Sequence, residues 1–126
     1  MTTQTQKKKI LIIEDEVALL TILQIRLSQA NFEVFTASDG NAGGDLATTV
    51  KPDVILLDIM MPGKDGFTLL RELKGNEETC NIPVIVVTAK DRIEDACTLE
   101  GAQGFIMKPF DYQKLEDSIN SILERD

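Results

Sequence analysis

Five short apolar segments alternate with longer amphipathic ones, and this alternation constrains the fold more than any other feature of the chain. Each apolar segment has the length of a β-strand, and most are rich in Val and Ile. They occupy residues 10–13, 32–35, 54–57, 82–87 and 105–107. Because the first, third and fourth are apolar almost throughout, we expect them to be covered on both faces, as the strands of a parallel sheet are.

The segments between the strands have helical periodicity. Apolar residues recur every three or four positions at Leu20, Leu23, Leu27 and Ala30, at Phe67, Leu70 and Leu73, and at Leu115, Ile119, Ile122 and Leu123. The second helix is weaker, since Gly43 and Gly44 each cost about 1 kcal/mol relative to Ala, and the fourth, over 91–100, has few apolar residues. Since strand–helix–strand units form right-handed crossovers, the pattern predicts an α/β fold, a doubly wound (βα)5 unit with helices on both faces of a five-stranded parallel sheet.

Size and charge limit the classes of function. A chain of 126 residues fits one domain, and we expect residues 1–7 to be a disordered tail and residues 8–126 to fold. The net charge of −8 repels phosphate backbones and anionic lipid, which argues against direct binding of nucleic acid. No leader or membrane-spanning segment is recognisable, so we expect a cytoplasmic protein.

The residue types that are missing narrow the chemistry further. The chain has no histidine, which excludes histidine general bases, histidine metal ligands and Ser-His-Asp hydrolysis. Cys80 and Cys97 match neither a zinc motif nor a disulfide framework, and we interpret both as reduced. Catalysis must therefore use Asp, Glu, Lys, Ser, Thr or Cys.

Polar side chains follow the predicted strands where each strand ends. Glu14 and Asp15 follow the first strand, Asp58 the third, Thr88 the fourth and Lys108 the fifth. Each alone has an ordinary interpretation, such as a helix N-cap for Asp15 or a solvated charge for Lys108. Because the carboxyl ends of parallel strands lie along one edge of the sheet, all five can converge on one crevice, and together they indicate a site.

This set of side chains predicts metal-dependent phosphoryl chemistry. Carboxylates gathered in a partly desolvated crevice repel one another, and Mg²⁺, which prefers oxygen ligands, would relieve the repulsion. A carboxylate nucleophile beside Mg²⁺, an ammonium and a hydroxyl is what an aspartyl phosphate requires. Asp58 is the predicted nucleophile because a rigid strand precedes it, and Glu14 and Asp15 are the predicted metal-holding pair.

The same motifs resemble a response-regulator receiver domain of the CheY-like superfamily. They are Glu14–Asp15, Asp58 to Pro62 with Asp65–Gly66, Thr88–Ala89, Gly101 to Phe105, and Lys108 to Phe110. The resemblance covers about residues 8–123, and the thirty positions from Asp58 to Thr88 are usual in the family. Ordered motifs with compatible spacing are far more specific than any one motif. The resemblance implies a strand order of 2-1-3-4-5.

The resemblance also implies roles at the metal site. Asp58 would be the phosphoacceptor. Asp15, Asp58 and the backbone carbonyl of Met60 would ligate Mg²⁺, while Glu14 would act largely through metal-bound water. Lys108 would contact the phosphoryl group.

A switching mechanism is implied as well. Thr88 would move its hydroxyl onto a phosphoryl oxygen, and Phe105 would turn inward as Thr88 vacates space. The surface built from the fourth helix, the fifth strand and the fifth helix would then change. Such a domain catalyses its own phosphorylation and dephosphorylation but is not a turnover enzyme.

The resemblance implies protein partners. Since the chain has no histidine, the donor would be a separate sensor histidine kinase or histidine phosphotransfer protein, docking over the strand edge and the first helix around residues 19–29. A downstream effector protein would read the switched surface, because we expect no output domain in this chain. A phosphorylation-dependent homodimer is left open.

The sequence departs from the family pattern between the fourth and fifth strands. Twenty positions separate Thr88 from Lys108, about two fewer than usual, and the shortening falls between Ala89 and Gly101. We therefore expect a shortened fourth helix or a shortened loop before it.

Three single positions also bear on the switch. Phe105 replaces the more frequent Tyr, so it has no hydroxyl to desolvate when it is buried. Met60 and Lys90 stand where the family tunes water access to the acyl phosphate. An apolar Met60 supplies no hydrogen bond to orient water, which predicts a phosphorylated lifetime that is not especially short.

Other functions fit less well. A nucleotide- or flavin-binding module would need a glycine- or hydroxyl-rich loop where residues 14–17 read EDEV. An aspartyl-phosphate phosphatase would usually need a second Asp at position 60, where Met60 stands. A degenerate receiver is opposed by the presence of all five polar site residues. A phosphorelay shuttle that passes the phosphoryl group on is the alternative to a terminal switch.

Overall fold

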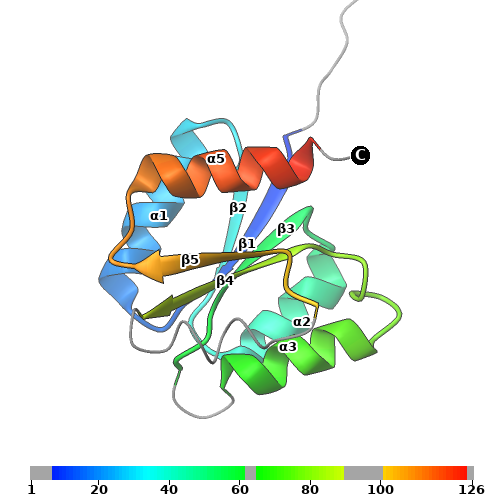
Figure 1. Ribbon diagram of the computed structural model, residues 1–126. Coiled ribbons are helices and arrows are strands. Elements are labelled where there is room, and N and C mark those ends of the chain that lie inside the picture. Colours follow the sequence, from blue (N-terminus) through cyan, green and yellow to red (C-terminus); the bar gives the residue numbers. More distant parts are fainter. Residues whose placement is uncertain (1–6, 62–64, 90–100, 125–126) are drawn as a thin grey trace, which may run out of the picture.

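The computed structural model describes residues 7–61, 65–89 and 101–124 (Figure 1). The elements are β1 (Lys9–Ile13), α1 (Val17–Gln29), β2 (Glu33–Ala37), α2 (Gly40–Val50), β3 (Val54–Asp58), α3 (Gly66–Gly75), β4 (Val84–Ala89), β5 (Gly104–Lys108) and α5 (Tyr112–Leu123). Strands and helices alternate from β1 to β4 as the sequence predicts, and the last strand is followed by the predicted last helix. The predicted fourth helix and the shortening expected there fall on residues 90–100 and lie outside the described residues.

The sheet has the predicted topology. Its strands are parallel and lie in the order β2-β1-β3-β4-β5. Figure 1 shows α1 and α5 on one face of the sheet and α2 and α3 on the other. The α/β class, the doubly wound arrangement and the 2-1-3-4-5 order are thus confirmed.

Two apolar layers hold the sheet between the helices. Successive strand residues point to opposite faces, and the two sets belong to different clusters. One contains Leu11, Ile13, Ile55, Leu57, Val84 and Val86 with residues of α2 and α3, and the other contains Ile10, Ile12, Val54, Leu56, Ile85 and Val87 with residues of α1 and α5. Because both faces of the central strands are buried, charged side chains can reach solvent only near the ends of the strands.

The bounds of all five strands differ by one or two residues from the predicted ones, and those of β3, β4 and β5 bear on the site. β4 begins at Val84 rather than at residue 82, since Pro83 has no N–H to donate to a neighbouring strand. β3 extends to Asp58 and β5 to Lys108. Asp58 is paired in register with Val87, and Lys108 with Ala89. The backbone of both residues is therefore held by the sheet.

The second helix forms although its two glycines weaken it. The Asp39 carboxylate accepts a hydrogen bond from the Ala42 N–H at 2.8 Å and caps its first turn. Its buried face is made of small residues, including Gly43 and Ala47, so tertiary packing outweighs the low helix propensity. Within the described ranges, no helix is long and apolar enough to span a membrane.

We predict that Gly66 is required where α3 begins under the end of β3. A Cβ at this position would lie 2.5 Å from the Ile59 Cα and 2.7 Å from the Asp58 carbonyl oxygen. Gly66→Ala should lower the free energy of unfolding by about 2 kcal/mol or more, because backbone atoms must shift. Denaturant titration measures this change. Gly75→Ala is the matched control, since no atom lies within 4 Å of the Cβ it would add; equal stability of the two variants would contradict the prediction.

Candidate functional site

The carboxyl edge of the sheet brings together polar side chains from four strands. Glu14 directly follows β1, Asp58 ends β3, Thr88 lies near the end of β4, and Lys108 ends β5. The arrowheads of β4 and β5 mark this edge in Figure 1. Residues up to 94 positions apart in sequence thus become neighbours.

Three carboxylates form the acidic part of the site. Glu14 and Asp58 are buried, each 3% exposed, and Asp15 is partly exposed. One oxygen of each lies within 4.8 Å of the others. The N-cap of α1 is Glu16, with no side-chain cap hydrogen bond, so the ordinary interpretation of Asp15 as a helix cap is wrong.

Lys108 balances part of this negative charge. Its Nζ lies 3.1 Å from Glu14 Oε1 and 3.3 Å from Asp58 Oδ2. The lysine side chain is 26% exposed, whereas each carboxylate side chain is only 4% exposed. The ammonium therefore belongs to the most exposed of the three side chains and contacts both buried carboxylates.

The packing of these charges shifts their pKa values. Burial raises the pKa of the Glu14 carboxyl to about 7, and a hydrogen bond and charge repulsion with Asp58 act in the same direction. Burial acts to lower the pKa of Lys108, but the combined attraction of Glu14 and Asp58 outweighs it and raises this pKa. Near neutral pH, Glu14 is consequently poised between its neutral and charged forms.

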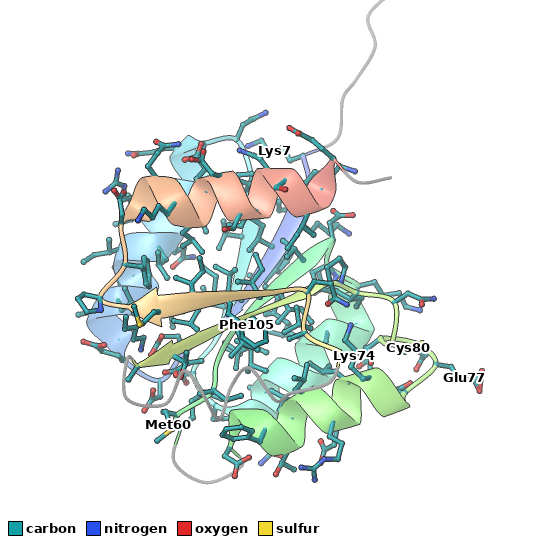
Figure 2. The ribbon with its side chains drawn as sticks, in the orientation of Figure 1. Lys7, Met60, Lys74, Glu77, Cys80 and Phe105 are labelled. Carbon is teal, nitrogen blue, oxygen red and sulfur yellow. The ribbon has the colours of Figure 1, made fainter. Side chains whose placement is uncertain are left out.

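Backbone contacts orient the two buried carboxylates. Asp58 Oδ1 accepts a hydrogen bond from the Met60 N–H at 2.9 Å, and Glu14 Oε2 accepts one from the Glu16 N–H at 3.1 Å. The Met60 side chain is 46% exposed and points away from the fold, as Figure 2 shows. The nucleophile predicted from the sequence is thus held by its strand, by one N–H and by one ammonium.

Thr88 and Phe105 lie on the same face of the sheet. The Thr88 hydroxyl is buried and donates to the Ala89 carbonyl oxygen across a long 3.4 Å. Phe105 is paired with Val86 in register and packs against the apolar layer of α2 and α3 (Figure 2). Since its hydrogen bond is weak, the Thr88 hydroxyl can turn to another acceptor at small energetic cost.

Two features of the site, the packing of Gly66 and a cavity beside Lys108, are not themselves predicted from the sequence. Gly66 packs against the Asp58 backbone, and its only signal in the sequence is the position of a glycine directly after Asp65, which caps α3. A cavity of about 460 Å³ lies beside Lys108, between α1 and the segment that follows β5. The apolar residues exposed on α1, among them Ile22, are the signal that could have revealed it.

The donor set fits Mg²⁺. It consists of carboxylate oxygens, which are hard ligands, and it brings more negative charge together than Lys108 alone can neutralise. Glu14, Asp15 and Asp58 are the side chains that could hold the ion. The role of the Met60 carbonyl as a further ligand stays a prediction.

The sequence comparisons point to one family. The family model of the response regulator receiver domain matches residues 10–120. Among curated relatives, the DNA-binding dual master transcriptional regulator RpaA of Synechocystis sp. is 38% identical over 119 residues, which cover 93% of this chain and 49% of the relative. The chain spans about half the length of the curated relatives it matches.

Solved structures agree with the sequence comparisons. A response regulator receiver domain protein from Clostridium thermocellum is 32% identical, with a TM-score of 0.86 and coverage of 94% of this chain and 95% of that one. The receiver domain of the sensor histidine kinase PA1611 from Pseudomonas aeruginosa is 26% identical, with a TM-score of 0.85 and coverage of 93% and 98%. That structure has a magnesium ion coordinated in its active site cleft.

We predict a pH-dependent loss of stability in the absence of divalent cations. The pKa of Glu14 is raised from 4.5 to about 7 on folding, so its contribution to stability is complete below pH 4.5 and is lost as the pH rises through about 7. Relative to Glu14→Gln, the wild type should lose up to about 3 kcal/mol of unfolding free energy over this range. Denaturant titrations of both proteins across the range measure the difference.

Magnesium provides the second arm of this test. Above pH 7, added Mg²⁺ should restore stability to the wild type and have a smaller effect on Glu14→Gln, because the ion replaces the missing proton. Parallel stability curves for the two proteins would contradict the prediction.

Proposed function

The chain belongs to the response regulator receiver domain family of two-component signalling, and we propose on this premise that Asp58 accepts a phosphoryl group from a phosphohistidine. The observation that carries the proposal is the placement of the Asp58 carboxylate. It is buried, one oxygen accepts the Met60 N–H, and the other faces the Lys108 ammonium. A carboxylate held in this way is oriented for attack before the donor arrives.

The proposed transfer is a displacement at phosphorus. An Asp58 carboxylate oxygen forms the new O–P bond as the P–N bond to the donor imidazole breaks. The bonding pair goes to the imidazole nitrogen, which takes a proton from solvent and leaves as neutral histidine. Lys108 would stabilise the charge on the transferred oxygens, since its ammonium already lies 3.3 Å from Asp58 Oδ2.

Glu14, Asp15 and Asp58 would hold Mg²⁺ during this step. When bound, the ion supplies positive charge to the attacking and transferred oxygens. The raised pKa of Glu14 supports this assignment, because charged carboxylates at such close range need a compensating cation.

The proposed output is a conformational switch through Thr88 and Phe105. The Thr88 hydroxyl would exchange its long hydrogen bond to Ala89 for one to a phosphoryl oxygen. Phe105 would move toward the space that Thr88 leaves, since both side chains lie on one face of the sheet. The fourth helix of the expected signalling surface lies outside the described residues, so the proposal rests here on β5 and α5.

The proposed donor docks on α1 and the segment after β5. Val17, Ile22 and Ile25 are large apolar side chains of α1, each more than half exposed. Ile22 also lines the cavity beside Lys108, together with Pro109 and Phe110. An apolar helix face next to the phosphoacceptor suits a helical partner that carries a phosphohistidine, either a sensor histidine kinase or a histidine phosphotransfer protein.

We infer that the domain acts in the cytoplasm through an effector and is not a turnover enzyme. The relative RpaA is named as a DNA-binding regulator. The net charge of −8 argues that any contact with DNA is made by another domain or protein, not by this unit.

Phosphorylation of Asp58 is tested by intact mass. After incubation with a small acyl phosphate and Mg²⁺, the wild type should gain one phosphoryl group and Asp58→Asn none, because an amide cannot act as the nucleophile. Asp45→Asn is the matched control, an exposed residue of α2 that should be phosphorylated like the wild type. If Asp58→Asn gains a phosphoryl group as readily as the wild type, the assignment fails.

The lifetime of the phosphorylated form depends on Met60. Met60→Asn should shorten the half-life by about threefold or more, because an amide can orient a water molecule toward the acyl phosphate and a thioether cannot. Met60→Leu, which keeps the position apolar, should leave the half-life unchanged. Both rates follow from the mass spectrum after removal of the phosphodonor, and an unchanged rate in Met60→Asn would refute the prediction.

A further inference from the structure

Lys74 makes an unusual set of contacts at the end of the sheet opposite the site. It lies in the last turn of α3, and its ammonium donates to the carbonyl oxygens of Ile82 at 2.7 Å and Cys80 at 3.3 Å, and to Gln103 Oε1 at 3.4 Å. Figure 2 shows Lys74 and Cys80 on the side of the molecule away from Met60. The three acceptors join α3 to the segments that enter β4 and β5.

Gln103 in turn holds Val84 by two hydrogen bonds. The Gln103 N–H donates to the Val84 carbonyl oxygen at 2.8 Å, and Gln103 Oε1 accepts the Val84 N–H at 2.8 Å. Regular pairing of β4 and β5 begins one residue later, with Ile85 opposite Gly104. The Gln103 side chain therefore extends the hydrogen-bonded pairing of β4 and β5 by one bond. The Lys74 ammonium keeps the amide oxygen of Gln103 turned toward Val84.

The chain just before Gln103 also packs on Lys74. Gly101 has φ +93°, and a Cβ at this position would lie 2.8 Å from the Lys74 Cγ. Burial lowers the pKa of the Lys74 ammonium, so its three acceptors offset a real desolvation cost. Lys74 thus contacts residues 101 and 103 through both its stem and its ammonium.

The register of β5 matters because this strand carries two residues of the proposed function. It lies at the edge of the sheet beside β4, and it is five residues long. A slip of one residue would turn Phe105 to the opposite face and move Lys108 along the strand, away from Glu14 and Asp58. An edge strand this short gains much from a fixed starting point.

We propose that Lys74 and Gln103 form a register clamp, which sets the alignment of β5 on β4 and so positions Lys108 against Asp58. Both are positioning residues, since neither reaches the carboxyl edge of the sheet. The proposal rests on the proposed role of Lys108 toward the phosphoryl group.

If the clamp exists, its removal should weaken the binding of a phosphoryl analogue but leave the binding of Mg²⁺ unchanged. Lys74→Met keeps the apolar stem against Gly101 and removes the ammonium. Its affinity for beryllofluoride, a phosphoryl analogue, in saturating Mg²⁺ should fall about tenfold or more, because Lys108 is misplaced. Its affinity for Mg²⁺ alone should stay within about twofold of the wild type, because the acidic ligands lie at the ends of β1 and β3 and not on β5. Isothermal titration calorimetry measures both constants.

Three further variants sharpen the test. Lys114→Met removes the same charge from an exposed position of α5 and should behave as the wild type. Gln103→Met should likewise weaken the binding of beryllofluoride and leave the binding of Mg²⁺ unchanged. Gln103→Glu should keep both affinities, since it keeps an acceptor for Lys74 and Val84. If Lys74→Met matches Lys114→Met, or if both affinities fall in parallel, the clamp is overturned.

Hydrogen exchange tests the clamp independently of phosphoryl chemistry. In Lys74→Met, the amides of Phe105 and Met107, which face β4 as the amide of Gln103 does, should exchange about tenfold faster, while those of 10–13 in β1 should not change. If the wild type binds no beryllofluoride, the proposed function fails, and the exchange rates alone then decide the clamp. Unchanged exchange at Phe105 and Met107 would overturn it.

Discussion

Burial of the parallel sheet between two layers of helices determines where every polar side chain of the site can lie. The central strands are apolar on both faces, and their charged neighbours come only where the strands end. Parallel strands all end at the same edge, so Glu14, Asp58, Thr88 and Lys108 meet there although they are distant in sequence. The site residues are held in place because the buried sheet holds the strand ends that carry them.

Electrostatics then decides what the edge can do. Two buried carboxylates and a third, partly exposed one face a single ammonium that contacts both buried groups. The pKa of Glu14 is raised to about 7, chiefly by burial and further by the hydrogen bond and charge repulsion with Asp58. Binding of a further cation such as Mg²⁺ would stabilise such a site, and the site could then accept an anionic phosphoryl group. The acidic composition of the chain thus has a specific use at this edge.

β5 connects the two ends of the molecule. At its carboxyl end Lys108 contacts Glu14 and Asp58, and at its beginning Gln103 and Lys74 hold it to β4 and α3. Phe105 lies between them, packed against the layer of α2 and α3. An edge strand is the easiest part of a sheet to displace, which suits a switch, but it must return to one register. The clamp that we propose would meet that need.

The sequence by itself determined the fold class, the strand order through a family resemblance, and the convergence of the carboxylates with Lys108, because strand ends can be located from apolar runs alone. For Asp15 taken alone it also allowed a helix cap, which is wrong, since cap geometry depends on backbone angles around Glu16. Only the tertiary structure decided the contacts of Lys74 and the raised pKa of Glu14. Both arise from burial among residues that are distant in the chain. Neither the burial of a charged group nor its contacts with distant residues produce a periodic pattern in the sequence.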